Sequence, residues 1–187
     1  VNQHFFVPAL EVARASQIVN FPVFGYVDSE NPWKKIKNGL PSTDSAKIFA
    51  EFDNLNVTKF QGLQTIFDGH FEDLTPFVQK MRLIKSQDEI DKMIVAGQFA
   101  DKAVKVGFDN ISLNNTETDI IAMIEFEMKK QGVEKMSFDT MVLTGNNAAN
   151  PHGIPGTNKI ENNALLLFDL GTDMYGYASD MTRTVAV

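Results

Sequence analysis

The C-terminal stretch of the chain has the pattern of a β-hairpin that carries two aspartates. The apolar run Leu165–Leu170 is typical of a strand, and residues 178–187 alternate β-branched with small or polar residues, as a second strand does. Glycines flank the segment between them, which indicates a turn. Such a hairpin constrains the fold, because its strands must be antiparallel neighbours with alternate residues on opposite faces. Asp169 lies in the first strand and Asp180 in the second.

The expected pairing brings the two aspartates together. With a turn centred on residues 174 and 175, Asp169 lies opposite Asp180, and carboxylates in that arrangement are about 5 Å apart and repel. A cation between them removes the repulsion. Asp169 follows an apolar run, so we expect it in the interior, where a carboxylate needs a partner. The spacing alone also fits a turn aspartate and a solvated strand aspartate. Asp173 is expected to close the turn by accepting a backbone N–H.

Strand alternation gives the aspartates a neighbour. Thr182 shares the expected face of Asp180, whereas Arg183 points the other way. We therefore expect Thr182 to donate a hydrogen bond that orients a carboxylate, and Arg183 to form a structural ion pair.

Two helices are expected before these strands. Ser86 and Glu89 have the spacing of a capping box, which predicts a helix that runs to about Val106 and stops at Gly107. A second helix is expected to begin near Thr116. Its apolar face is predicted to consist of Ile120, Ile124 and Met128. With a further strand at 138–143, the pattern predicts an α+β unit.

The segment 145–158 is dense in Gly, Asn and Pro, and we expect a loop without helix. A polar loop of this length inside a compact domain is more often functional than not. It carries His152 between Pro151 and Gly153, an arrangement that allows close approach of a ligand. Taken alone, His152 also fits an ordinary surface-loop histidine.

Residues 1–78 alternate expected strands and helices, which predicts an α/β domain. The strands are expected at 5–7, 21–27 and 46–52, and the helices at 9–19 and 33–40. Residues 76–84 are interpreted as a passage between domains. We therefore expect one domain over 1–78 and a second over 79–187.

Composition excludes several classes of function. The net charge of −7 disfavours nucleic-acid binding and anionic membrane surfaces, and the absence of cysteine excludes disulfides and thiolate metal sites. No apolar run reaches the length of a membrane span, so a cytoplasmic location is expected. The first residue is Val and the last residues lie in an expected strand, so we expect a fragment that lacks both ends.

Three motifs occur in a characteristic order: N-P-H-G at 150–153, F-D-L-G at 168–171 and S-D-M-T-R-T at 179–184. Together they resemble the first half of the pita-bread metallopeptidase domain of methionine aminopeptidases, Xaa-Pro peptidases and creatinase. The helix entry R-L-I-K-S-Q-D-E-I at 82–90 is similar to the creatinase and aminopeptidase P branch. The N-terminal part is similar to bacterial Xaa-Pro dipeptidases (prolidases), with a partial creatinase-like α/β domain preceding the first half of the pita-bread domain.

The resemblance implies a hydrolase with a dinuclear metal centre. Asp169 matches a ligand of one metal ion, Asp180 the aspartate that bridges both, and His152 the histidine that contacts the substrate carbonyl. Mn²⁺ is expected, with Co²⁺ or Zn²⁺ as alternatives. A bridging hydroxide would attack the bond preceding proline in an Xaa-Pro dipeptide, and the intact protein is expected to be a homodimer.

The remaining ligands implied by the family are a histidine and two glutamates from the second half of the domain, beyond residue 187. We therefore expect this chain alone to be inactive and to bind metal poorly. Two alternatives stay open: an Xaa-Pro aminopeptidase (aminopeptidase P) acting on longer peptides, and a non-catalytic pita-bread module that binds peptides or proteins.

Overall fold

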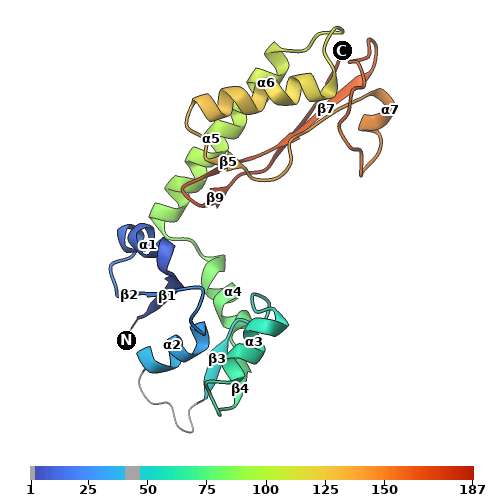
Figure 1. The fold of residues 1–187 in the computed structure, drawn as a ribbon. Coiled ribbons are helices and arrows are strands. Elements are labelled where there is room, and N and C mark those ends of the chain that lie inside the picture. The colour runs from blue at the N-terminus through green and yellow to red at the C-terminus, as the bar shows by residue number, and fades with distance from the viewer. Residues whose placement is uncertain (1–2, 41–46) are drawn as a thin grey trace. The chain divides into compact units, whose positions relative to one another are not determined.

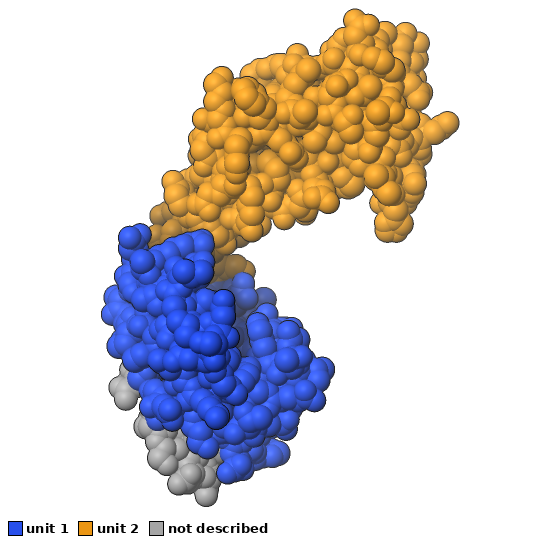
Figure 2. Space-filling view, viewed as in Figure 1, with its two compact units in different colours: residues 1–84 blue, residues 85–187 orange. Residues whose placement is uncertain are grey.

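The computed structural model describes residues 3–40 and 47–187. The chain forms two compact units, 1–84 and 85–187 (Figure 2). The sequence placed the division at residue 78, which lies inside helix α4 (Thr75–Leu83). The expected passage at 76–84 is therefore mostly helical. None of the helices in the described residues combines the length and apolar character needed to cross a membrane.

Unit 1 is built from short strands and helices (Figure 1). Before α4 the order is β1 (Phe5–Pro8), the 3₁₀ helix η1 (Ala9–Glu11), α1 (Val12–Ile18), β2 (Val23–Tyr26), α2 (Pro32–Gly39), β3 (Ile48–Ala50), α3 (Val57–Gln64) and β4 (Phe71–Asp73). β1 pairs with β2 and β3 pairs with β4, both in parallel, which confirms the α/β expectation. The strand expected at 46–52 is shorter in the structure, and residue 46 lies outside the described residues.

Unit 2 begins with the two expected helices, α5 (Gln87–Asp109) and α6 (Glu117–Lys130). The strands and helix that follow are β5 (Lys135–Met136), β6 (Met141–Thr144), α7 (Gly145–Ala148), β7 (Leu165–Leu170), β8 (Thr172–Met174), β9 (Tyr177–Ala178) and β10 (Met181–Ala186). The strands form two antiparallel sheets, ordered β10-β7-β6 and β5-β8-β9. The expectation of an α+β unit is therefore confirmed.

The core of unit 2 lies between the helices and the sheets, and Figure 1 shows α5 and α6 along one side of the strands. The predicted α6 face is confirmed, because Ile120, Ile124 and Met128 are all fully buried. Gly107 does not end α5, contrary to expectation. It lies within the helix, where a Cβ atom would come within 2.6 Å of the Phe168 ring. Its function is close packing of helix against strand.

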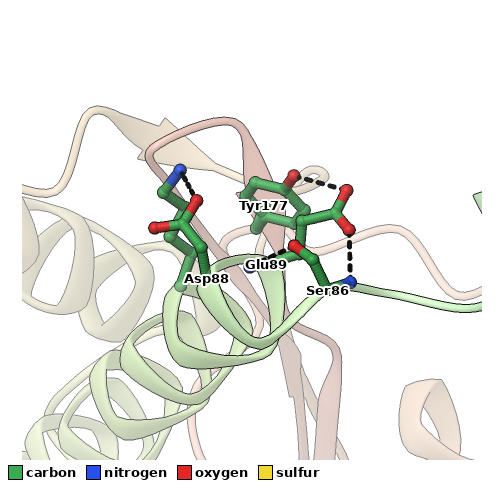
Figure 3. A network of polar contacts seen from close by, with 5 residues as sticks. Ser86, Asp88, Glu89 and Tyr177 are labelled. Carbon is green, nitrogen blue, oxygen red and sulfur yellow. Dashed lines mark hydrogen bonds and ion pairs between the residues drawn. The ribbon is translucent and has the colours of Figure 1, made fainter.

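The start of α5 is tied to the hairpin of β8 and β9 (Figure 3). The predicted capping box is confirmed: the Ser86 hydroxyl accepts from the Glu89 N–H, and the Glu89 carboxylate accepts from the Ser86 N–H at 2.7 Å. The Tyr177 hydroxyl donates to the same carboxylate at 2.9 Å. These hydrogen bonds, with the Ser86 backbone first, lower the pKa of Glu89, while the bond to Glu89 raises the pKa of Tyr177.

Candidate functional site

Strand β7 presents a packed face and an open face. Leu166, Phe168 and Leu170 alternate along the strand and are fully buried beneath the helices. Residues of the opposite parity lie on the other face: Leu165 is 58% exposed and Asp169 is half-buried. The expectation of an interior Asp169 is therefore wrong, because the apolar run before it is buried on one face only.

The hairpin register differs from the expected one. Its turn is at Tyr175 and Gly176, which both have positive φ (57° and 79°), as a type I′ turn requires. The turn lies one residue later than predicted, so each residue of β7 faces a partner two positions further on. Asp169 therefore lies opposite Thr182, and the prediction that it faces Asp180 directly is wrong.

Thr182 and Asp169 are joined across the two strands. The Thr182 hydroxyl donates to Asp169 Oδ1 at 2.8 Å and so fixes the orientation of the carboxylate. Asp180 lies just before β10 and is exposed. It has the same parity as Thr182, which makes it a diagonal neighbour of Asp169, and such neighbours are about 7–8 Å apart. The two carboxylates thus share an open face without meeting head-on.

Asp173 and Arg183 both differ from expectation, and Arg183 forms no ion pair with the acidic residues that the structure describes. Asp173 does not close the turn; it lies in β8 opposite Lys135, with Lys135 Nζ 3.3 Å from Oδ2. The Oδ1 atom of Asp173 is buried without a hydrogen-bond partner among the described residues. Arg183 is exposed, and its Nη1 donates to the carbonyl oxygen of Thr182 at 2.8 Å.

The segment 145–158 does contain a helix, contrary to expectation: the single turn α7 packs on β6 and β7. Gly145 makes its start possible by adopting a φ of +53°. Beyond α7, the backbone N–H of His152 donates to Asn150 Oδ1 at 3.0 Å, and His152 itself is exposed. Gly153 is buried, and a Cβ atom there would come within 2.7 Å of the Asn147 carbonyl oxygen.

A buried carboxylate that the sequence did not indicate holds this loop. Glu117, the first residue of α6, is fully buried and accepts hydrogen bonds from backbone and side chains of the segment 144–158. The abundance of amide donors in the loop was a signal that an acceptor is needed. Nothing in the sequence told which of the chain's many acidic residues supplies it.

A hollow of about 440 Å³ lies on the open face between α7 and strands β7 and β10. Leu167 and Thr184, one rung along from Asp169 and Thr182, form part of its lining. Asp169 is therefore the next same-face residue along β7 from this hollow, whereas Asp180 lies further along the face, and neither aspartate lines the hollow.

The structure brings together only part of the predicted site. Asp169 and Thr182 are in contact and Asp180 follows on the same face, while His152 belongs to a separate loop. Within the described ranges, no three His, Cys, Asp or Glu residues are grouped closely enough to hold a metal ion. Two carboxylates on an open face suit hard divalent cations, but they supply only part of a ligand set.

Comparisons with known proteins agree with this architecture. The model of metallopeptidase family M24 matches residues 91–187. An Xaa-Pro dipeptidase of Lactobacillus helveticus is 43% identical, and the alignment covers 99% of this chain and 52% of that protein.

Solved structures give the same result. The X-Pro aminopeptidase of Thermotoga maritima superposes with a TM-score of 0.89 at 26% identity, over 100% of this chain and 53% of that one. An Xaa-Pro dipeptidase from Bacillus anthracis gives 0.88 at 29% identity, over 100% and 52% respectively. The chain thus spans about half the length of the relatives it matches. Because the family model also matches more than half of its residues, the chain belongs to metallopeptidase family M24.

Proposed function

We propose that this chain is the first half of a metal-dependent Xaa-Pro dipeptidase. The observation that carries the proposal is the pair Asp169 and Asp180 on the open sheet face, within a chain 43% identical to an Xaa-Pro dipeptidase over nearly its whole length. An acidic pair on one sheet face, with one carboxylate oriented by a hydroxyl, is typical of a prepared cation site.

Asp169 and Asp180 would hold two divalent ions, for which we propose Mn²⁺, with Co²⁺ or Zn²⁺ as alternatives. When bound, such ions act as Lewis acids and lower the pKa of a coordinated water toward neutrality. Thr182 fixes one oxygen of Asp169, which leaves the other free to coordinate. His152 would donate a hydrogen bond to the carbonyl oxygen of the scissile bond as negative charge develops there.

The chain by itself supplies two of the proposed ligands, and we propose that a histidine and two glutamates come from the second half of the domain. Calorimetric titration of the 187-residue chain with Mn²⁺ should show binding weaker than micromolar. Micromolar or tighter binding that is lost in Asp180→Asn would contradict this division of the site.

The proposed substrate specificity is tested by peptide-cleavage assays on the full-length protein. We expect manganese-dependent hydrolysis of Xaa-Pro dipeptides and little cleavage of Xaa-Pro-Xaa tripeptides. The likeness to an X-Pro aminopeptidase keeps the second candidate open, and preferential cleavage of tripeptides would favour it. A non-catalytic binding module would cleave neither peptide, with or without added Mn²⁺.

Three further expectations are proposals of the same kind. Unit 1 would be part of a creatinase-like N-terminal domain and unit 2 the first half of the pita-bread domain. A homodimer of the full-length protein is tested by light scattering, and a cytoplasmic location by cell fractionation. A monomeric or secreted protein would contradict the respective expectation.

A further inference from the structure

We propose that Glu117 is a positioning residue that holds the His152 loop in its active arrangement. This inference rests on the proposed function, because it assumes that His152 meets the substrate. Glu117 lies on α6, far from His152 in sequence, and does not belong to the open face that carries the aspartates.

Both oxygens of the Glu117 carboxylate are occupied by donors from the loop and its flanks. Oε1 accepts from the Thr144 N–H at 2.8 Å and from Asn147 Nδ2 at 3.0 Å. Oε2 accepts from the Gly156 N–H at 2.9 Å, from Asn158 Nδ2 at 3.0 Å and from Asn147 Nδ2 at 3.1 Å. A side chain that is fully buried therefore has its acceptor capacity used on one segment of the chain.

These contacts clamp the loop at both ends. Thr144 and Asn147 lie at its entry, while Gly156 and Asn158 lie at its exit, and His152 is in the middle. The backbone at the start of α6 adds to the exit clamp, because the N–H of Glu117 donates to the carbonyl oxygen of Asn158 at 3.1 Å. Asn147 Nδ2 also donates to the Ile154 carbonyl oxygen at 3.0 Å, which extends the anchoring to within two residues of His152.

The chemistry of the cluster calls for a carboxylate. All its partners are N–H donors, so an acceptor-only group satisfies every one of them. A glutamine of the same size would turn its amide NH₂ toward either the Thr144 N–H or the Gly156 N–H, and that buried backbone donor would lose its acceptor. Transfer of a carboxylate from water into the protein interior costs free energy. The position of Glu117 at the N-terminus of α6 and its hydrogen bonds offset that cost.

The test compares two variants of the full-length protein. Glu117→Gln keeps the volume but breaks the clamp. Asp119→Asn, in the same first turn of α6, weakens the helix cap, since Asp119 bonds the N–H of Thr116 at 2.8 Å and has no role in the loop cluster. We expect Glu117→Gln to lower kcat for an Xaa-Pro dipeptide by about 10- to 100-fold, because small misplacement of a reacting group has effects of this size. Metal content should stay unchanged, and Asp119→Asn should keep kcat within about twofold of wild type.

Hydrogen–deuterium exchange of residues 144–158 provides a readout that does not depend on activity. Exchange should be faster in Glu117→Gln and unchanged in Asp119→Asn. If Glu117→Gln fails to fold, Asn158→Ala removes a single donor from the exit clamp and should give the same effects at smaller size. Equal kcat in the Glu117 and Asp119 variants, or unchanged loop exchange, would overturn the inference. An inactive wild-type enzyme would instead refute the proposed function, and the exchange comparison would still decide whether Glu117 holds the loop.

Discussion

Neighbouring residues of β7 lie in opposite surroundings. Phe168 is fully buried against α5, where Gly107 makes room for its ring and Phe108 packs edge-on at 5.2 Å between centroids. Asp169 lies half-buried on the opposite face, where the Thr182 hydroxyl holds its carboxylate. One strand thus separates the residues that stabilise the unit from those proposed to carry the chemistry, and substitutions one position apart should separate the two effects.

The largest effect is expected on activity. Asp180→Asn in the full-length protein should lower kcat by on the order of 10³-fold, since metal ions supply several kcal/mol of transition-state stabilisation. Stability should change by less than about 1 kcal/mol, because Asp180 is exposed and the change is isosteric. Steady-state kinetics and thermal unfolding on the same preparation measure both. A variant that retains wild-type kcat would show that the open face is not the metal site.

On the packed face of β7 we expect a large effect on stability. Phe168→Ala should destabilise the 187-residue chain by about 3–5 kcal/mol, as truncation of a buried aromatic side chain does. Leu165→Ala, on the open face of the same strand, should cost less than about 1 kcal/mol because its side chain is already largely exposed. Urea unfolding of both variants tests the contrast, and similar losses of stability would break it.

A smaller effect is expected at the hydroxyl that holds Asp169. Thr182→Val keeps the shape but removes the 2.8 Å bond, and loss of such an outer-shell partner typically lowers metal affinity or activity by about 10- to 100-fold. Thr184→Val, one rung further along the same face, is the matched control and should stay within about twofold. Mn²⁺ titration of the full-length variants distinguishes them, and equal affinities would show that the Thr182 hydroxyl does not orient a metal ligand.

The smallest effect concerns the link between α5 and the hairpin. The pKa of Glu89 is lowered, so its contribution to stability is present above the ordinary glutamate pKa and is lost as the pH falls through the lower folded value. The pKa of Tyr177 is raised, so its contribution is lost only as the pH rises through that higher value. Tyr177→Phe should therefore lower Tm at neutral pH, with the difference shrinking below about pH 4. A difference that is independent of pH would contradict this assignment.

Local signals predicted much of unit 2. The capping box at Ser86 and Glu89 and the apolar face of α6 depend on residues three or four positions apart, so the sequence contains their full cause. The hairpin register depends on Tyr175 adopting a left-handed conformation, which is rare for a residue with a side chain. Because the turn was predicted one residue too early, Asp180 was expected opposite Asp169, where the structure has Thr182.

The loop anchor could not be predicted for a different reason. Glu117 acquires its function from donors that follow it by 27 to 41 positions and that the fold brings to it. Gly107 is a similar case: its sequence context is that of a helix stop, and its partner Phe168 is known only once α5 packs on β7. Periodicity and motif spacing describe neighbours along the chain, so they could not predict these contacts between distant segments.

Asp169 and Asp180 are proposed to hold catalytic metal ions on the open face of β7. Anomalous diffraction from crystals of the full-length protein grown with Mn²⁺ tests this proposal most directly. We predict manganese peaks within coordination distance of both carboxylates, about 2.0–2.2 Å from their oxygens as for other divalent transition metals. Manganese bound elsewhere in an active enzyme, with neither aspartate as a ligand, would contradict it.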